Sequence, residues 1–143
     1  MSSRKISGQV NKPLQEVFTY LVNPENLPHW GDGIIETTLL SDSPIGVGST
    51  FRIKNKMGGR VQEFVSEVID YEANHKYAFK TGSGIMGYTS TRNFEKSPGG
   101  TLITERIEGQ YSGLSTLLVP LILGFIKSSH QKSLNRLKEI LEK

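Results

Sequence analysis

The hydrophobic pattern changes period near the N-terminus of the chain. Apolar and polar residues alternate over "KISGQV" (5–10), which predicts a strand that turns Ile6 and Val10 toward the interior. Pro13 follows, and proline is well placed in the first turn of a helix, where its missing N–H costs nothing. The next apolar residues recur at helical spacing and predict one buried helix face: Leu14, Val17, Phe18 and Leu21.

Two prolines interrupt the helical pattern soon afterwards. Asn23-Pro24 is expected to end the first helix, because the residue before a proline disfavours helical backbone. The segment "PENLPHW" (24–30) then suits a second short helical turn with Leu27 and Trp30 on its inner side. The pattern therefore predicts two short helices with a bend where one long helix would otherwise run.

From residue 33 onward the pattern has period two, with turn-forming residues between the segments. Strands are expected at about 33–41, 48–57, 60–71, 76–82, 85–96 and 101–112. The last element, at about 115–142, is expected to be helical, with Pro120 either kinking it or lying near its start. Its apolar residues at helical spacing include Leu118, Leu121, Phe125, Leu134, Leu137 and Leu141.

This order of elements predicts an α+β fold. Six consecutive strands joined by short hairpins must be antiparallel, and with the first strand they form a sheet of about seven strands. Such a sheet buries one face, so the long C-terminal helix is expected to cover it. A curved sheet wrapped on a helix leaves a concave space between them, which is where an internal cavity is expected.

Length and composition favour one domain over residues 1–143, large enough to bury a core without covalent staples. The absence of cysteine excludes disulfides, thiolate metal sites and a cysteine nucleophile. His29, His75 and His130 show no ligand spacing, so we expect no metal site, and no motif indicates a cofactor. The N-terminal segment has no apolar core of a signal peptide, so a cytoplasmic location is expected.

The charge pattern argues against nucleic acid as a partner. A net charge of +3 arises from 17 basic and 14 acidic residues that are interspersed, without a basic stripe interleaved with aromatic residues. The longest apolar run (114–126) contains a proline and a glycine and is shorter than the roughly 20 residues needed to span a bilayer. It is expected to be a buried or cavity-facing helix, with peripheral membrane contact as the alternative.

The last hairpin can be placed in register from its turn and its periodicity. The apolar residues fall on even positions in 86–94 and on odd positions in 103–111. A tight turn centred on Pro98-Gly99 pairs residues whose numbers add to a constant, and this pairing places both apolar sets on one face. The expected inward pairs are Phe94 with Ile103, Ser90 with Ile107 and Met86 with Tyr111.

The same register places Arg92 directly opposite Glu105 on the inward face. Removing two charges from water costs several kcal/mol each, which a good pair only roughly offsets. Three hypotheses follow. The pair is a structural cross-strand contact, Arg92 anchors a carboxylate, hydroxyl or carbonyl of a ligand, or Glu105 acts as an acid–base catalyst. A separate acid–base pair of His29 and Asp32 near the mouth is a further alternative.

Several segments resemble the START-like (SRPBCC) superfamily, in particular its polyketide cyclase/dehydrase and lipid-transport proteins. They are "VNKPLQEVFTYLVNPENLPHW", "SDSPIGVGSTFR", "SEVIDYEANHKYAFKT", "FEKSPGGTLITERIEG" and the C-terminal segment from residue 114. The resemblance covers essentially the whole chain and implies a helix-grip fold with a largely apolar cavity, one end of which the short helices close. Trp30 would belong to that closing wall, and the alternative is that it is a plain core tryptophan.

The expected ligand is therefore a small hydrophobic or amphipathic molecule. The polar spot would be Arg92 and Glu105, and a carrier or sensor role is the first hypothesis. The alternatives are a cyclase, dehydratase or hydrolase acting in the same cavity, and a protein-interaction module whose cavity is collapsed. The residues expected to line the cavity are Trp30, Phe51, Ile53, Phe79, Met86, Tyr88, Tyr111, Leu118, Leu121 and Phe125.

Overall fold

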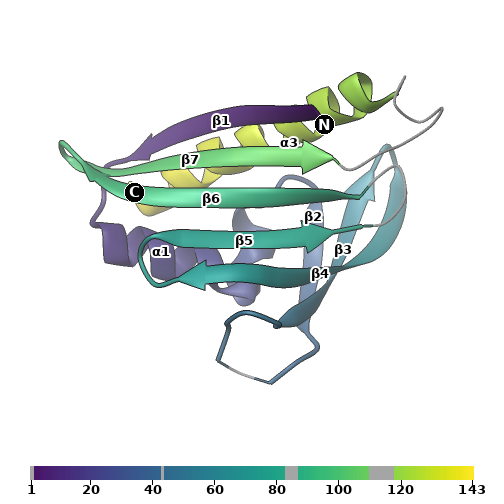
Figure 1. The fold of residues 1–143 in the computed structure, drawn as a ribbon, viewed down its shortest axis with the longest axis horizontal. Helices are drawn as coiled ribbons and strands as arrows, with labels where there is room; N and C mark the ends of the chain where they lie inside the picture. Colours follow the sequence, from purple (N-terminus) through teal and green to yellow (C-terminus); the bar gives the residue numbers. More distant parts are fainter. Residues whose placement is uncertain (1, 43, 83–86, 110–117) are drawn as a thin grey trace.

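The structure is a computed structural model that describes residues 2–42, 44–82, 87–109 and 118–143. Its centre is a seven-stranded antiparallel sheet that curls around the N-terminal helices (Figure 1). The strands are β1 (Ser2–Val10), β2 (Ile34–Leu39), β3 (Thr50–Met57), β4 (Arg60–Glu72), β5 (Lys76–Thr81), β6 (Tyr88–Ser97) and β7 (Gly100–Gly109).

The sheet order explains why the N-terminal helical region is broken by prolines. The strands lie in the order β1-β7-β6-β5-β4-β3-β2, so β1 and β2 follow one another in the chain but form opposite edges. The chain crosses the inner face between these edges in three short helices, α1 (Leu14–Val22), η1 (Pro24–Asn26) and α2 (Leu27–Trp30). The predicted bend is confirmed: the Asn23 side chain accepts a hydrogen bond from the Glu25 amide and caps η1.

The C-terminal helix α3 (Val119–Leu141) lies behind β1 and β7 (Figure 1). Pro120 lies in its first turn, as one of the two expected placements required. Residues 115–117 of the predicted helix lie outside the described residues. The described part contains no helix long and apolar enough to cross a membrane.

The predicted register of the last hairpin is confirmed. Pro98 and Gly99 form the turn between Ser97 and Gly100, and Gly99 adopts the positive φ of 85° that favours glycine. The paired residues on the inner face are Phe94 with Ile103, Arg92 with Glu105 and Ser90 with Ile107. The predicted pair of Met86 and Tyr111 lies outside the described residues.

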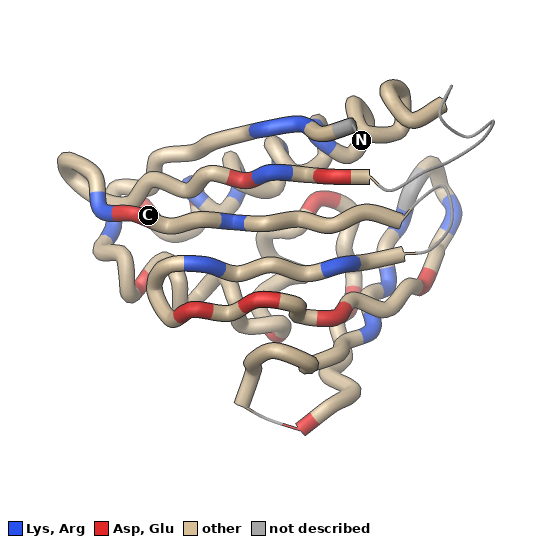
Figure 2. The backbone as a smooth tube through the Cα atoms, viewed as in Figure 1, with Lys and Arg blue, Asp and Glu red and all other residues tan. Residues whose placement is uncertain are grey.

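The two faces of the sheet differ in polarity. The inner face packs apolar side chains of β1, β3, β5, β6 and β7 against the helices, with Trp30, Ile103 and Leu137 fully buried. On the outer face, acidic residues lie along β4 beside basic residues of β5 (Figure 2). Lys76 bonds Asp70 at 3.0 Å and Lys80 lies 3.5 Å from Glu67, so this face is a solvated surface of paired charges.

Gly100 offers a test of how closely β7 approaches the end of β1. A Cβ atom at Gly100 would lie 2.1 Å from the Val10 carbonyl oxygen, so Gly100→Ala must displace backbone. We expect a loss of about 1–3 kcal/mol in the free energy of unfolding by denaturant titration. Gly46→Ala is the control, because a Cβ there meets no atom within 4 Å, and equal stability of the two variants would contradict this packing.

Candidate functional site

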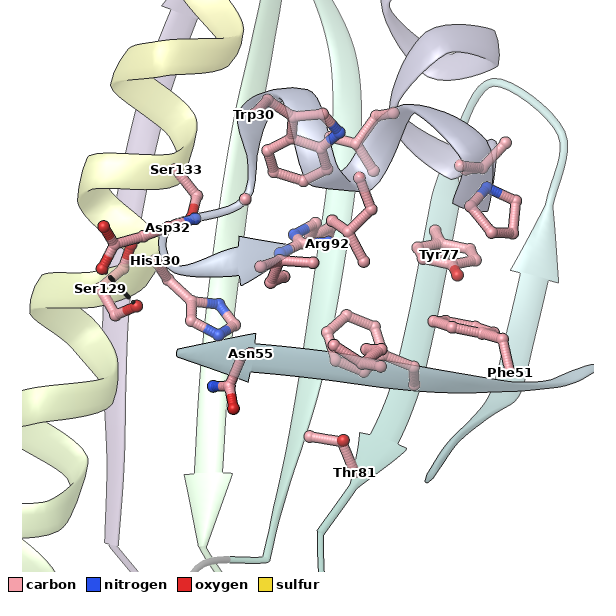
Figure 3. A pocket seen from close by; sticks show the side chains of 18 of the residues that line it. Trp30, Asp32, Phe51, Asn55, Tyr77, Thr81, Arg92, Ser129, His130 and Ser133 are labelled. Carbon is pink, nitrogen blue, oxygen red and sulfur yellow. Dashed lines mark hydrogen bonds between the residues drawn. The ribbon is translucent and has the colours of Figure 1, made fainter. Parts of the chain in front are cut away.

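The site is built around Arg92, a buried cation on the inner face of β6. Its side chain lies between two aromatic rings, with Cζ at 5.3 Å from the ring centroid of Trp30 on α2 and 5.2 Å from that of Phe79 on β5. Figure 3 shows the guanidinium group beneath Trp30. Both contacts are cation–π interactions, which are stronger when the cation is removed from water, as here at 5 % exposure.

Glu105 on β7 neutralises Arg92 from behind. One carboxylate oxygen accepts a hydrogen bond from Arg92 Nε at 3.1 Å, and the other accepts one from Ser90 Oγ at 2.6 Å. The second oxygen also bonds Nδ1 of His130, which reaches in from α3. Glu105 is fully buried, so its hydrogen bonds to these three partners replace the hydrogen bonds to water that it loses on folding.

The partners of Glu105 decide its ionisation. Burial by itself raises the pKa of the carboxyl, but the charge of Arg92, the neighbouring His130 and the hydroxyl of Ser90 together lower the pKa well below its ordinary value. Glu105 is therefore a carboxylate at neutral pH. Tyr77 on β5 shows the opposite behaviour, because burial raises the pKa of its phenol to about 12 and keeps it protonated.

His130 links the carboxylate to Tyr88 on β6. The Tyr88 hydroxyl lies 2.9 Å from His130 Nε2, and the two rings pack edge to face at 5.4 Å between centroids. Glu105, His130 and Tyr88 thus form one continuous chain of hydrogen bonds from the core of the sheet to the space beneath α3.

That space consists of two adjoining chambers that share part of their walls. The inner one, of about 90 Å³, lies between the sheet and the short helices and contains Arg92, Trp30 and Phe79 in its wall. The outer one, of about 490 Å³, lies between α3 and the ends of β3, β4 and β5. The residues that border both chambers are Asp32, Asn55, Phe64, Thr81, Tyr88, Ser129 and His130.

Unpartnered polar atoms lie in the wall of the inner chamber. The indole N–H of Trp30 and the amide oxygen of Asn55 are buried, and neither has a hydrogen-bond partner in the part of the chain that the structure describes. Within the described residues the Arg92 Nη nitrogens have no bonding partner either, since its hydrogen bond to Glu105 uses Nε. The buried Trp30 and Asn55 atoms have almost no accessible surface, so the donor group that a molecule in the chamber can meet is the Arg92 guanidinium.

The segment after α2 is tied to α3 beside the chambers. Asp32 accepts a hydrogen bond from Ser129 Oγ at 3.0 Å, and the Asp32 amide donates to Ser133 Oγ at 2.8 Å (Figure 3). The proposed His29–Asp32 pair is wrong, because His29 faces a separate surface groove beside Tyr20 and the far end of α3.

The structure brings together most of the residues that the sequence placed at the cavity. The inner chamber is lined by Trp30, Phe51, Ile53, Phe79, Tyr88 and Arg92. Glu105 does not line either chamber and contacts the site through Arg92 and His130. Met86 and Tyr111 lie outside the described residues.

The expected wall residues of the C-terminal helix need correction. Leu118, Leu121 and Phe125 are 50 %, 74 % and 54 % exposed. Leu118 and Leu121 border neither chamber, and Phe125 reaches only the outer one. The buried face of this end of α3 consists of Val119, Leu123 and Ile126. Nearly every residue in 118–126 is apolar, so the pattern did not determine which side of the helix turns inward.

His130 is the functional residue that sequence reasoning missed. In the sequence His130 has no partner histidine at the spacing of metal ligands, so the pattern assigns it no role. A signal was present, because His130 lies four residues after the buried Ile126 and four before the buried Leu134. A histidine on the buried stripe of a helix that packs on a sheet needs a polar partner there. No cluster of three His, Asp or Glu side chains suited to a metal occurs among the described residues.

Comparison with known proteins now gives the class and the family. A curved antiparallel sheet that grips a long helix around a chamber defines a helix-grip protein. The chain belongs to the polyketide cyclase / dehydrase and lipid transport family, whose model matches residues 4–142. No curated protein sequence matches it.

Solved structures show the same fold at low sequence identity. Ara h 8.0201 is similar with a TM-score of 0.78, 12 % identity and 99 % of each chain covered. Protein NE0264 from Nitrosomonas europaea has a TM-score of 0.78 and 14 % identity over 98 % of this chain and 94 % of its own. The di-domain aromatase/cyclase StfQ of the steffimycin biosynthetic pathway has a TM-score of 0.78 and 12 % identity, with 96 % of this chain matching 49 % of it.

The buried ion pair predicts a large loss of stability when one member is removed. Arg92→Met leaves the Glu105 carboxylate without its main countercharge, and we expect a loss of about 3–5 kcal/mol in the free energy of unfolding by denaturant titration. Lys80→Met breaks the exposed pair with Glu67 and should cost less than about 1 kcal/mol. Similar losses in the two variants would contradict a dry site.

The lowered pKa of Glu105 predicts how stability depends on pH. Because its pKa is lower in the folded than in the unfolded chain, the stabilisation is complete above the ordinary value of 4.5 and is lost as the pH falls below it. We expect the difference in unfolding free energy between the wild type and Glu105→Gln to narrow by at least about 1 kcal/mol from pH 7 to pH 3. Denaturant titrations at several pH values measure it, and a constant difference would show that the carboxylate is not specially stabilised.

Proposed function

We propose that the protein binds a small amphipathic molecule in the two adjoining chambers. The observation that carries this proposal is the buried guanidinium of Arg92, which lines a mainly apolar inner chamber and uses only Nε in its hydrogen bond to Glu105. A pocket lined mainly by aromatic and aliphatic side chains with a few convergent polar groups is typical of small-molecule sites. Membership of a family described by both cyclase activity and lipid transport is consistent with such a ligand.

The size of the chambers indicates how the ligand lies. The inner chamber, at about 90 Å³, holds a polar head group and not a whole hydrophobic molecule. The outer chamber, at about 490 Å³, accommodates the apolar body between Phe64, Phe125 and Ile126. The ligand would therefore enter with its polar end toward Arg92 and leave its apolar end nearer the opening.

The polar groups of the inner chamber favour an oxygen acceptor on the head group. A carboxylate or carbonyl oxygen would accept hydrogen bonds from the Arg92 Nη groups, since the bond to Glu105 uses only Nε. Transfer of the apolar body from water supplies the rest of the affinity, at about 25 cal/mol per Å².

The single tryptophan of the chain lies in the site and makes binding measurable without a label. We expect decanoate to change Trp30 fluorescence on titration and to bind at least about tenfold more tightly than 1-decanol, because Arg92 recognises the carboxylate. Arg92→Met should remove this preference and retain 1-decanol binding. Arg92→Lys, which keeps the buried charge, is used if Arg92→Met does not fold.

Arg52→Met is the matched control for this experiment. Arg52 lies on β3 between two residues of the inner chamber but is itself exposed, so its loss should leave the preference unchanged. A chain whose Trp30 fluorescence responds to neither probe would contradict the proposal and favour the interaction module. Loss of the preference in Arg52→Met would show that it reflects surface charge and not the chamber.

A further inference from the structure

The hydrogen-bonded chain from Glu105 to Tyr88 is not needed for binding a head group at Arg92. A role confined to anchoring α3 on the sheet would be served by an apolar contact at lower desolvation cost. Instead, a fully buried carboxylate, an imidazole and a phenol follow one another, and the imidazole forms hydrogen bonds with both of the others. Anchoring of α3 therefore does not explain why these three polar groups are linked.

The ionisation of Glu105 determines where the protons of this chain lie. A carboxylate has no proton to donate, so His130 Nδ1 must carry the hydrogen of the bond to Glu105. In the neutral imidazole the other nitrogen, Nε2, is then an acceptor, and it accepts a hydrogen bond from the Tyr88 hydroxyl, with 2.9 Å between oxygen and nitrogen. The carboxylate thus selects the tautomer in which His130 is a base toward Tyr88.

The two members of the chain that border the chambers are partly exposed, and the third is not. Glu105 is fully buried, the His130 side chain is 12 % exposed, and Tyr88 is partly exposed. Tyr88 and His130 border both chambers, whereas Glu105 borders neither. Tyr88 and His130 are therefore the members that a bound molecule can touch, and Glu105 reaches the chambers only through His130. Arg92 lies in the inner chamber on the same strand as Tyr88.

We propose that Tyr88, His130 and Glu105 form an acid–base relay for proton transfer at a carbon atom next to a carbonyl group of the bound ligand, with Arg92 holding the carbonyl oxygen. The inference rests on the proposed function, because the same inner chamber positions the ligand. Tyr88 is the catalytic residue, His130 stores the proton and Glu105 is a positioning residue.

The step conserves atoms and electrons. The Tyr88 oxygen takes the proton from the carbon beside the carbonyl as the Tyr88 hydroxyl passes its own proton to His130 Nε2. The electron pair of the broken C–H bond forms the carbon–carbon double bond, and the carbonyl π pair moves to oxygen, where Arg92 stabilises the negative charge. His130 is then an imidazolium paired with Glu105. Return of the proton to carbon or oxygen gives the ketone or its enol, and no co-reactant is consumed.

Isotope exchange of simple ketones tests this relay. The probes are 1-tetralone and 2-decanone in D₂O, with loss of the protons beside the carbonyl followed by ¹H NMR and binding followed by Trp30 fluorescence. We expect the wild type to accelerate exchange over buffer. His130→Gln and Tyr88→Phe should each lower the accelerated rate at least about tenfold at saturating ketone while ketone binding is retained. A merely structural contact would not separate the exchange rate from binding in this way.

Matched controls remove the same chemical groups elsewhere. Tyr71→Phe deletes a phenol hydroxyl from a residue that borders neither chamber, and His75→Gln replaces an exposed histidine of the β4–β5 turn. Both should exchange protons at the wild-type rate. A loss of rate in either control, or a wild-type rate in Tyr88→Phe, would overturn the assignment of the relay.

The outcomes separate this inference from the proposed function. Ketones that bind without accelerated exchange overturn the relay and leave ligand binding standing. Binding of decanoate without binding of either ketone overturns the assignment of a ketone substrate and likewise leaves the proposed function intact. Absence of binding for every probe overturns both.

A measurement without ligand tests the proton positions directly. In protein labelled with ¹⁵N-histidine, we expect His130 Nδ1 to carry a strongly downfield proton, because it donates to a carboxylate. This resonance should persist in Tyr88→Phe and move upfield in Glu105→Gln. A His130 whose Nδ1 carries no proton would overturn the relay whatever the exchange experiment shows.

Discussion

The burial of one ion pair constrains much of this molecule. Arg92 and Glu105 face each other across β6 and β7 with almost no contact with solvent, so each charge needs the other and needs further partners. The Glu105 carboxylate forms further hydrogen bonds with Ser90, which lies on β6 beside Arg92, and with His130 on α3. The rings of Trp30 and Phe79 cover the Arg92 guanidinium. Sheet, short helices and long helix therefore meet at this pair, and any change in their arrangement leaves a charge unsatisfied.

The connection between β1 and β2 forms one wall of the inner chamber that Arg92 lines. Because these two strands are the opposite edges of the sheet, the chain between them must cross the concave face, and it does so in short helices separated by prolines. A single long helix would pack along the face, whereas the bend brings Trp30 over Arg92 and ties Asp32 to α3. The inner chamber is what remains between this crossing segment and the sheet.

The sequence was most informative where contacts are local. The register of β6 and β7, including the Arg92–Glu105 pair, followed from a turn at Pro98-Gly99 and from alternation on either side of it. Because the two strands of a hairpin are joined by a short turn, the geometry of that turn fixes which residues pair. His130 lies on a separate element, and its contact with Glu105 depends on the position and rotation of α3 over the sheet. The spacing of Ile126, His130 and Leu134 indicates the buried side of this part of α3, but no local pattern encodes where the helix lies on the sheet.

The amino-acid sequence by itself determined the order of the elements, the bend after Val22, the antiparallel hairpins and the inward placement of Arg92 and Glu105. Period, proline and turn chemistry act over a few residues, which is why these features could be derived. Only the tertiary structure decided that Leu118 and Leu121 face outward, because the start of α3 is apolar almost all round and packing alone selects its buried side. The same packing brings His130 between Glu105 and Tyr88, so the chemistry of the site depends on how a helix lies on a sheet.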